Sequence, residues 1–140
     1  MKLKITLMLI AAAFLLSGTA LAADYILVVN KANAVSTLSP QDAKKVFLGK
    51  KSSWSDGKRV VLYSQKNPDL TKAFTEGVVK KSPQQFMVFW KKALFTGTGK
   101  PPVEVADDAQ MKQAIAADPQ GIGYISVSEL DGTVKQLIVN

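Results

Sequence analysis

The sequence contains neither histidine nor cysteine. Their absence excludes serine–histidine triads, cysteine nucleophiles and most zinc sites. It also excludes a disulfide framework and any thiol chemistry, although an exported protein could carry disulfides. We therefore expect no catalytic residues, no metal and no cofactor, and we predict that the protein is not an enzyme.

The first residues have the pattern of a secretory signal peptide. Lys2 and Lys4 precede an almost unbroken apolar run over 5–16, and the small residues that follow end in an Ala-x-Ala cleavage site. We predict cleavage after Ala22, which leaves residues 23–140 as one exported domain without an integral membrane anchor. A retained anchor is the alternative, but the run is short for a bilayer span of about 20 residues. An exported protein without disulfides suits a bacterial periplasm better than eukaryotic secretion.

The protein carries a formal net charge of +7, of which Lys2 and Lys4 contribute two units. The remaining basic residues are scattered widely and form only a few adjacent pairs, which usually lie on solvated helix faces and loops. Nucleic-acid binding would need a coherent basic stripe with interleaved aromatic residues, and export argues against it. The charge therefore indicates a mild attraction for anions or acidic surfaces, and no nucleic-acid partner.

Strand and helix signals alternate along the chain. The apolar run 25–30 is typical of a buried parallel or central strand. Further strands are predicted at 59–64, 103–105, 122–127 and 134–139. Helices are predicted to begin at Ser39-Pro40, at Asn67 or Asp69, at Ser82-Pro83 and at about Asp107, the first of them ending at Gly49 and the last at Ala117. This alternation predicts one α/β sandwich, without internal repeats or a domain linker.

Helical spacing identifies the side chains expected to face the core. They are Ala43, Val46 and Phe47, then Leu70, Ala73, Phe74 and Val78, then Phe86, Phe89, Trp90, Ala93 and Leu94, and finally Met111, Ala114 and Ile115. Trp90 and Trp54 are interpreted as packing residues rather than as ligand stackers.

Two segments bear a superficial likeness to chemical sites. The loop 96–100 reads Thr-Gly-Thr-Gly-Lys, but a phosphate-binding P-loop needs Gly-x4-Gly-Lys-Ser/Thr between a strand and a helix, and here Pro-Pro follows the lysine. Asp107 and Asp108 could form a carboxylate pair, but adjacent residues at a helix start point apart and suit capping. Neither segment predicts chemistry.

The stretch "YSQKNPDLTKAF" (63–74) joins a strand directly to a helix. Such joins often hold anions, because free N–H groups and the positive end of the helix dipole meet there. This join contains no glycine, however, and Asp69 occupies the place where an anion would lie. The sequence leaves three interpretations open: a ligand site, the relic of one, or a well-capped helix.

Three segments together resemble the phosphate-binding periplasmic proteins of ABC transporters. "LSPQDAKKVFLGKKSSWSDG" (38–57) is similar to that family's helix, glycine and tryptophan loop, "SDGKRVVLYSQ" (55–65) leads to its ligand segment, and "PQGIGYIS" (119–126) is similar to its Pro-Gly-x-Ile-Gly-Tyr signature. The resemblance implies a type II periplasmic-binding-protein fold, with a mixed sheet flanked by helices. Family members close two lobes on the anion, whereas this chain has room for about one.

The family's ligand segment reads Arg-x-Asp-Gly-Ser-Gly-Thr. The resemblance places it on the candidate ligand-binding residues Gln65, Lys66, Asn67, Asp69, Leu70 and Thr71, with Pro68 among them. Only Thr71 matches the family's pattern. A glutamine cannot make the bidentate charged contact of an arginine, Pro68 has no N–H, and Asp69 repels an anion.

The resemblance thus implies a periplasmic solute-binding-type protein that binds phosphate or another small anion weakly. The alternative is a non-enzymatic interaction module, or adaptor, that docks on a membrane sensor or transporter and whose ligand site has degenerated.

Overall fold

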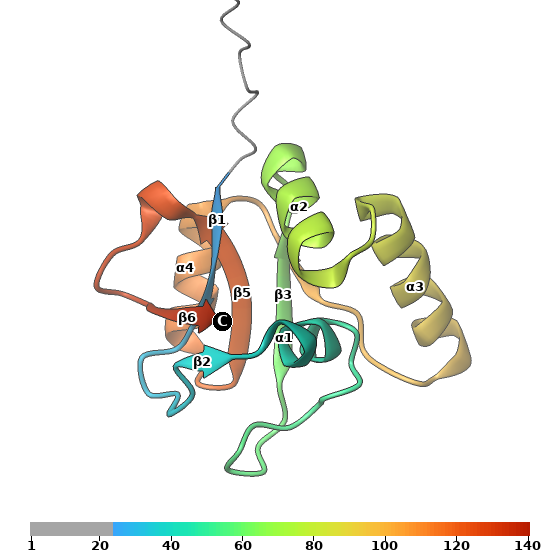
Figure 1. Cartoon of the computed structure of the whole chain (residues 1–140), viewed down its shortest axis with the longest axis horizontal. Coiled ribbons are helices and arrows are strands. Elements are labelled where there is room, and N and C mark those ends of the chain that lie inside the picture. The colour runs from blue at the N-terminus through green and yellow to red at the C-terminus, as the bar shows by residue number, and fades with distance from the viewer. Residues whose placement is uncertain (1–23) are drawn as a thin grey trace, which may run out of the picture.

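The computed structural model describes residues 24–140, which form a mixed sheet with helices on both faces (Figure 1). The six strands are β1 (Tyr25–Val29), β2 (Thr37–Leu38), β3 (Val61–Gln65), β4 (Val103–Val105), β5 (Gly121–Ser126) and β6 (Lys135–Val139). Their order across the sheet is β2-β6-β1-β5-β3-β4. The predicted signal peptide and its cleavage site lie outside the described residues.

Strand β1 lies inside the sheet and runs antiparallel to both of its neighbours, β5 and β6. The other pairs, β2 with β6, β3 with β5 and β3 with β4, are all parallel. The apolar run 25–30 was expected to be a parallel or a central strand, and it is central. Val28 and Val29 are completely buried there, because helices cover both faces of the sheet.

The helices are α1 (Pro40–Phe47), α2 (Pro68–Phe74), α3 (Pro83–Thr96) and α4 (Asp108–Ala117). A π-helical turn, η1 (Thr75–Val79), continues α2, and a short 3₁₀ turn, η2 (Val127–Glu129), follows β5. Side chains from α1, α2, η1 and α3 pack on one face of the sheet, whereas α4 packs on the other. The predicted α/β fold with a mixed sheet flanked by helices is confirmed.

Local hydrogen bonds explain where the helices begin. Ser39, Asn67, Ser82 and Asp107 each accept a bond from a backbone N–H of the first helical turn. Ser82 also forms a capping box with Gln85, as its sequence predicts. Of the two caps considered for α2, Asn67 is the one used.

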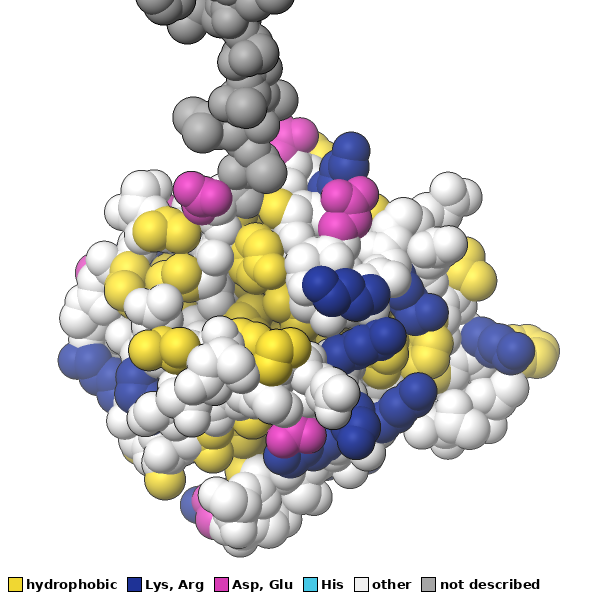
Figure 2. Space-filling view, viewed as in Figure 1, with side chains coloured by type: hydrophobic (Ala, Val, Ile, Leu, Met, Phe, Trp, Pro, Cys, Tyr) yellow, Lys and Arg dark blue, Asp and Glu magenta, His cyan; other side chains and the backbone are white. Residues whose placement is uncertain are grey.

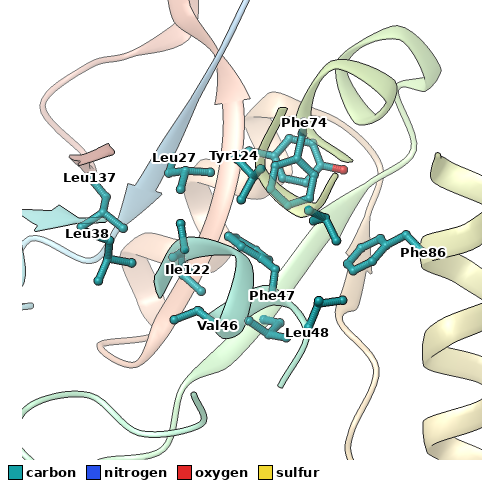
Figure 3. Close-up of a cluster of buried hydrophobic side chains, with 14 of the residues drawn as sticks. Leu27, Leu38, Val46, Phe47, Leu48, Phe74, Phe86, Ile122, Tyr124 and Leu137 are labelled. Atoms are coloured by element: carbon teal, nitrogen blue, oxygen red, sulfur yellow. The ribbon is translucent and has the colours of Figure 1, made fainter. Parts of the chain in front are cut away.

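The larger core cluster centres on Phe74 of α2 (Figure 3). Its ring stacks on Tyr124 of β5 at a centroid distance of 4.0 Å and meets Phe47 of α1 edge-on at 4.7 Å. On the other face Met111 of α4 lies so close to Gly123 that an added Cβ would stand 2.5 Å from the methionine sulfur. Glycine at this position therefore lets α4 pack directly against the sheet.

Both tryptophans are packing residues, as predicted. The Trp90 Nε1 donates to the Phe47 carbonyl (3.2 Å), and the Trp54 Nε1 donates to the Gln120 carbonyl (2.9 Å). Both side chains are buried.

Two sequence predictions need correction. Leu94 was expected in the core but is 62% exposed, because only a narrow stripe of α3 made by Phe86, Trp90 and Ala93 faces inward. Leu94 lies roughly 80° around the helix from Phe86, which carries it past the edge of that stripe. The strand predicted at 59–64 begins two residues later, since the preceding residues pair with 52–53 in a small hairpin.

Candidate functional site

The candidate site is the join between β3 and α2, at the carboxyl end of β3. Asn67 Oδ1 accepts the N–H of Leu70 (3.2 Å), and the Asn67 carbonyl accepts the N–H of Thr71 (3.0 Å). Pro68, the first helical residue, has no N–H. The chain itself therefore uses much of the donor capacity that a helix start would otherwise offer to an anion.

Gln65 is turned into the protein and is only 3% exposed. Its Nε2 donates to the Tyr124 carbonyl (2.9 Å) and to Asp108 Oδ1 (2.8 Å). Its Oε1 is buried and has no hydrogen-bond partner among the described residues. Gln65 thus ties β3 to β5 and α4, and its side chain does not reach outward as a ligand-binding arginine would.

Thr71 and Tyr124 close a ring of hydrogen bonds with the backbone of Gln65. The Gln65 N–H donates to the Tyr124 hydroxyl (3.2 Å), and the Thr71 hydroxyl donates to the Gln65 carbonyl (2.8 Å). The two hydroxyl oxygens lie 2.8 Å apart. Because the Thr71 proton is used on the carbonyl, Tyr124 must donate to Thr71, which it can do because burial raises the pKa of its hydroxyl and keeps it protonated. The ring leaves neither hydroxyl proton free.

Of the other candidate residues, some are exposed to solvent and one is buried. Lys66 and Asp69 are exposed, and the Lys66 ammonium lies 4.0 Å from the exposed Glu104 carboxylate. The Leu70 side chain is 1% exposed, so only its backbone is near the join. Lys72 is also exposed, one turn into α2. The exposed surface of the join therefore combines two lysines with the Asp69 carboxylate, and the Glu104 carboxylate lies beside Lys66.

Asp108 also belongs to this region, and its contacts were not predicted from the sequence. Its carboxylate accepts from Gln65 Nε2, from the Ser126 N–H (3.2 Å) and from the Ser126 hydroxyl (2.7 Å). Its neighbour Asp107 caps α4, as predicted. Asp108 instead turns toward the sheet, where it anchors β3 and β5 to α4.

A cavity among the described residues lies away from the join. It has a volume of about 400 Å³ and lies at the amino end of β3, beside Val61 and Leu62. Trp90 lines it, as do the basic residues Lys51, Arg59 and Lys100, and no carboxylate does. Strand geometry places it roughly 13 Å from Gln65. It is a second place where an anion could bind.

Within residues 24–140, no three Cys, His, Asp or Glu side chains are grouped so that they could hold a metal ion. None of the helices in that range has the length and apolar character needed to cross a bilayer.

Solved structures of phosphate-transport proteins resemble this fold. A putative phosphate ABC transporter substrate-binding protein from Clostridium perfringens, with bound phosphate, is 20% identical over 83% of this chain, with a TM-score of 0.65. A possible phosphate binding protein from Planctomyces limnophilus is 15% identical over 84%, with a TM-score of 0.60. An ABC-type phosphate transport receptor from Vibrio cholerae is 17% identical over 81%, with a TM-score of 0.56.

The chain has the fold of these substrate-binding proteins. The fold that the sequence resemblance implied is thereby confirmed. The chain spans 44%, 41% and 45% of the lengths of these three proteins, in the order given above. No family model and no curated protein matches the sequence.

Proposed function

We propose that this chain is an exported, non-enzymatic solute-binding domain that binds phosphate or another small oxyanion weakly at the join between β3 and α2. The observation that carries the proposal is the placement of a capped helix start at the carboxyl end of β3, between the exposed lysines Lys66 and Lys72. The likeness to a phosphate-bound substrate-binding protein supports it. The ligand contacts would come from the candidate residues Gln65, Lys66, Asn67, Asp69, Leu70 and Thr71, the buried Gln65 and Leu70 contributing only through the backbone.

The affinity should be low because the join offers few free donors. A hydrogen bond between an anion and a charged group is worth about 1.5–3 kcal/mol, and Lys66 and Lys72 are the charged donors that an anion at the join would meet. Asp69 opposes part of that attraction. The net binding free energy should be near −4 kcal/mol or weaker, which corresponds to a dissociation constant of about 1 mM or above.

Calorimetry with inorganic phosphate tests the proposal on the wild type and on Asp69→Ser. The variant should bind more tightly, and the gain should shrink at high salt because the effect is electrostatic. Glu76→Ser is the matched control, since it removes one exposed carboxylate from the same continuous helix about 10 Å further along. Binding that Arg59→Gln abolishes and Asp69→Ser leaves unchanged would move the site to the cavity at the other end of β3.

The second candidate is an adaptor that docks on a membrane sensor or transporter. The closed hydrogen-bond ring of Gln65, Thr71 and Tyr124 favours it, because the join is satisfied by the chain's own groups without a ligand. A thermal-shift panel of anions separates the two candidates. A solute-binding domain is stabilised by an anion, whereas the adaptor is stabilised by none.

Export belongs to the same proposal and rests on the sequence alone. If residues 1–22 are a signal peptide, N-terminal sequencing of the protein from the periplasmic fraction should begin at Ala23 or within a residue or two of it. Recovery of the protein with Met1 from that fraction, or only from the cytoplasm, would contradict export by cleavage.

A further inference from the structure

The outer face of α3 carries a stripe of exposed apolar side chains. Met87 is 52% exposed, Val88 58%, Leu94 62% and Phe95 93%. Residues seven apart lie on nearly the same side of an α-helix, so 87 aligns with 94 and 88 with 95. The opposite side of α3 packs into the core. The stripe therefore remains uncovered within residues 24–140.

Lysines accompany this stripe, and acidic residues do not. Lys91 and Lys92 lie on α3 between its two apolar pairs, both exposed. The segment 77–103 also contains Lys80, Lys81 and Lys100, but no aspartate or glutamate. Its charge of +5 equals the net charge of residues 24–140 as a whole, so the acidic and basic residues elsewhere in that range balance. The apolar stripe thus lies in a region whose charge equals the whole excess of positive charge of residues 24–140.

The position of α3 leaves this face accessible. The helix forms one end of the molecule, away from β2 and β6 (Figure 1). Lysine and hydrophobic side chains lie beside one another over that end (Figure 2). We call the side chains of Met87, Val88, Lys91, Lys92, Leu94 and Phe95 the α3 surface.

We propose that the α3 surface binds an anionic phospholipid bilayer, with Leu94 and Phe95 entering the interfacial region and the lysines contacting the lipid headgroups. Leucine and phenylalanine partition into the interface, and lysine stems can lie along apolar surface while their ammonium groups reach the headgroups. Lysines near an anionic membrane strengthen binding further. This proposal does not depend on anion binding at the β3–α2 join.

The charges and exposures favour a bilayer over the other occupants. A second copy of the same face would bring lysines against lysines with no acidic group between them. An acidic protein would need a pocket matched to Phe95, which projects almost fully exposed next to the loop that begins at Gly97. A bilayer needs no such pocket.

Vesicle flotation tests the proposal with phosphatidylcholine vesicles that contain or lack phosphatidylglycerol. The chain beginning at Asp24 contains every strand and helix described, and its fold is checked by circular dichroism. The full chain is run in parallel. We expect at least about tenfold tighter binding to the anionic vesicles, and a decrease as salt rises.

Variants locate the contact. The double variant Leu94→Ser, Phe95→Ser should weaken binding by at least about tenfold, because it removes apolar area from the interface. Lys91→Gln and Lys92→Gln should each weaken it about fivefold. The control Val127→Ser, Leu130→Ser removes two exposed apolar side chains on and beside η2 and should leave binding unchanged.

Three results would overturn the proposal. One is equal binding to both kinds of vesicle. Another is equal loss in the α3 variant and the η2 control. The third is no vesicle binding at all, which would favour an acidic protein partner, or a second copy if size-exclusion shows a dimer that Phe95→Ser dissociates.

Discussion

The hydroxyl oxygens of Thr71 and Tyr124 lie 2.8 Å apart, which joins the first turn of α2 to the middle of β5. The contact belongs to the ring that also uses the backbone N–H and carbonyl of Gln65. The ring uses polar groups that the proposed anion site would otherwise offer to a ligand. While it is closed, the hydroxyl protons and the Gln65 N–H already have acceptors.

Replacing Tyr124 with phenylalanine should destabilise the protein by about 1–3 kcal/mol. The aromatic side chain and its stacking on Phe74 are retained, but the buried Gln65 N–H loses its acceptor. An unsatisfied buried donor costs about 1–3 kcal/mol. Urea unfolding of both proteins measures the difference. Tyr25→Phe is the control, because the Tyr25 hydroxyl makes no hydrogen bond within residues 24–140, and its effect should stay within about 0.5 kcal/mol. Equal stability of Tyr124→Phe and wild type would show that the ring adds no net stability.

The same substitution bears on ligand binding. Tyr124→Phe removes the hydrogen bond between Tyr124 and Thr71, so the Thr71 Oγ1, on a partly exposed side chain, can accept one from a protonated anion oxygen. If the join is an anion site, phosphate should bind more tightly to Tyr124→Phe than to the wild type in calorimetry. Unchanged binding would place the anion elsewhere on the protein.

Trp90→Ala should cost about 3–5 kcal/mol, as large aromatic deletions in cores do. The Trp90 ring is 5% exposed, and Gly49 and Gly99 both lie against it. Phe95→Ala, on the same helix, removes a ring that is 93% exposed and should change stability by no more than about 0.5 kcal/mol. Thermal melts of the two variants provide the comparison. A melting temperature for Trp90→Ala within a degree or two of wild type would mean that the packing of Trp90 does not hold α3 against the rest of the protein.

The helix starts could be predicted because their causes are local. The Ser82–Gln85 capping box and the Ser39 cap depend on residues three positions apart, so the sequence alone specifies them. The face of α3 that meets the core is different, because the rest of the fold decides how wide a stripe of the helix becomes buried. Leu94 was misplaced for that reason. Strand β2 was not predicted because its two residues become a strand only by pairing with β6.

The candidate site shows the same limit. The cap at Asn67 and the departures from the family's ligand segment are readable in the sequence. The bond between Thr71 and Tyr124 joins residues 53 positions apart, and that between Gln65 and Asp108 joins residues 43 apart. No local sequence pattern encodes such contacts. That the polar groups of the join are already hydrogen-bonded within the protein can therefore be seen only in the folded structure.

Gly49→Ala should be more destabilising than Gly57→Ala. Both glycines have a positive φ, +71° and +83°, where an L-residue costs roughly 1–2 kcal/mol. An added Cβ at Gly57 meets open space, but at Gly49 it would lie 2.9 Å from the Trp90 ring. Denaturant unfolding of the two variants separates backbone strain from the contact with Trp90. Equal losses would indicate that Trp90 shifts at no cost.

Tyr63, on β3, should titrate at a higher pH than Tyr25, on β1. Burial, followed by its 2.7 Å hydrogen bond to Asp118 and the charge of that carboxylate, raises the pKa of Tyr63 to about 12. Because the raised pKa belongs to the folded state, the associated stability is fully present below the ordinary tyrosine value of 10.0 and is lost as pH rises from there toward 12.

Asp118→Asn removes the charge but not the burial, so the pKa of Tyr63 should fall only part of the way. The pKa of Tyr25, raised by burial alone, should stay where it is. Tyrosinate absorbance, with Tyr63→Phe to assign the transition, measures both groups. A Tyr63 transition that Asp118→Asn leaves unmoved would show that burial alone sets its pKa.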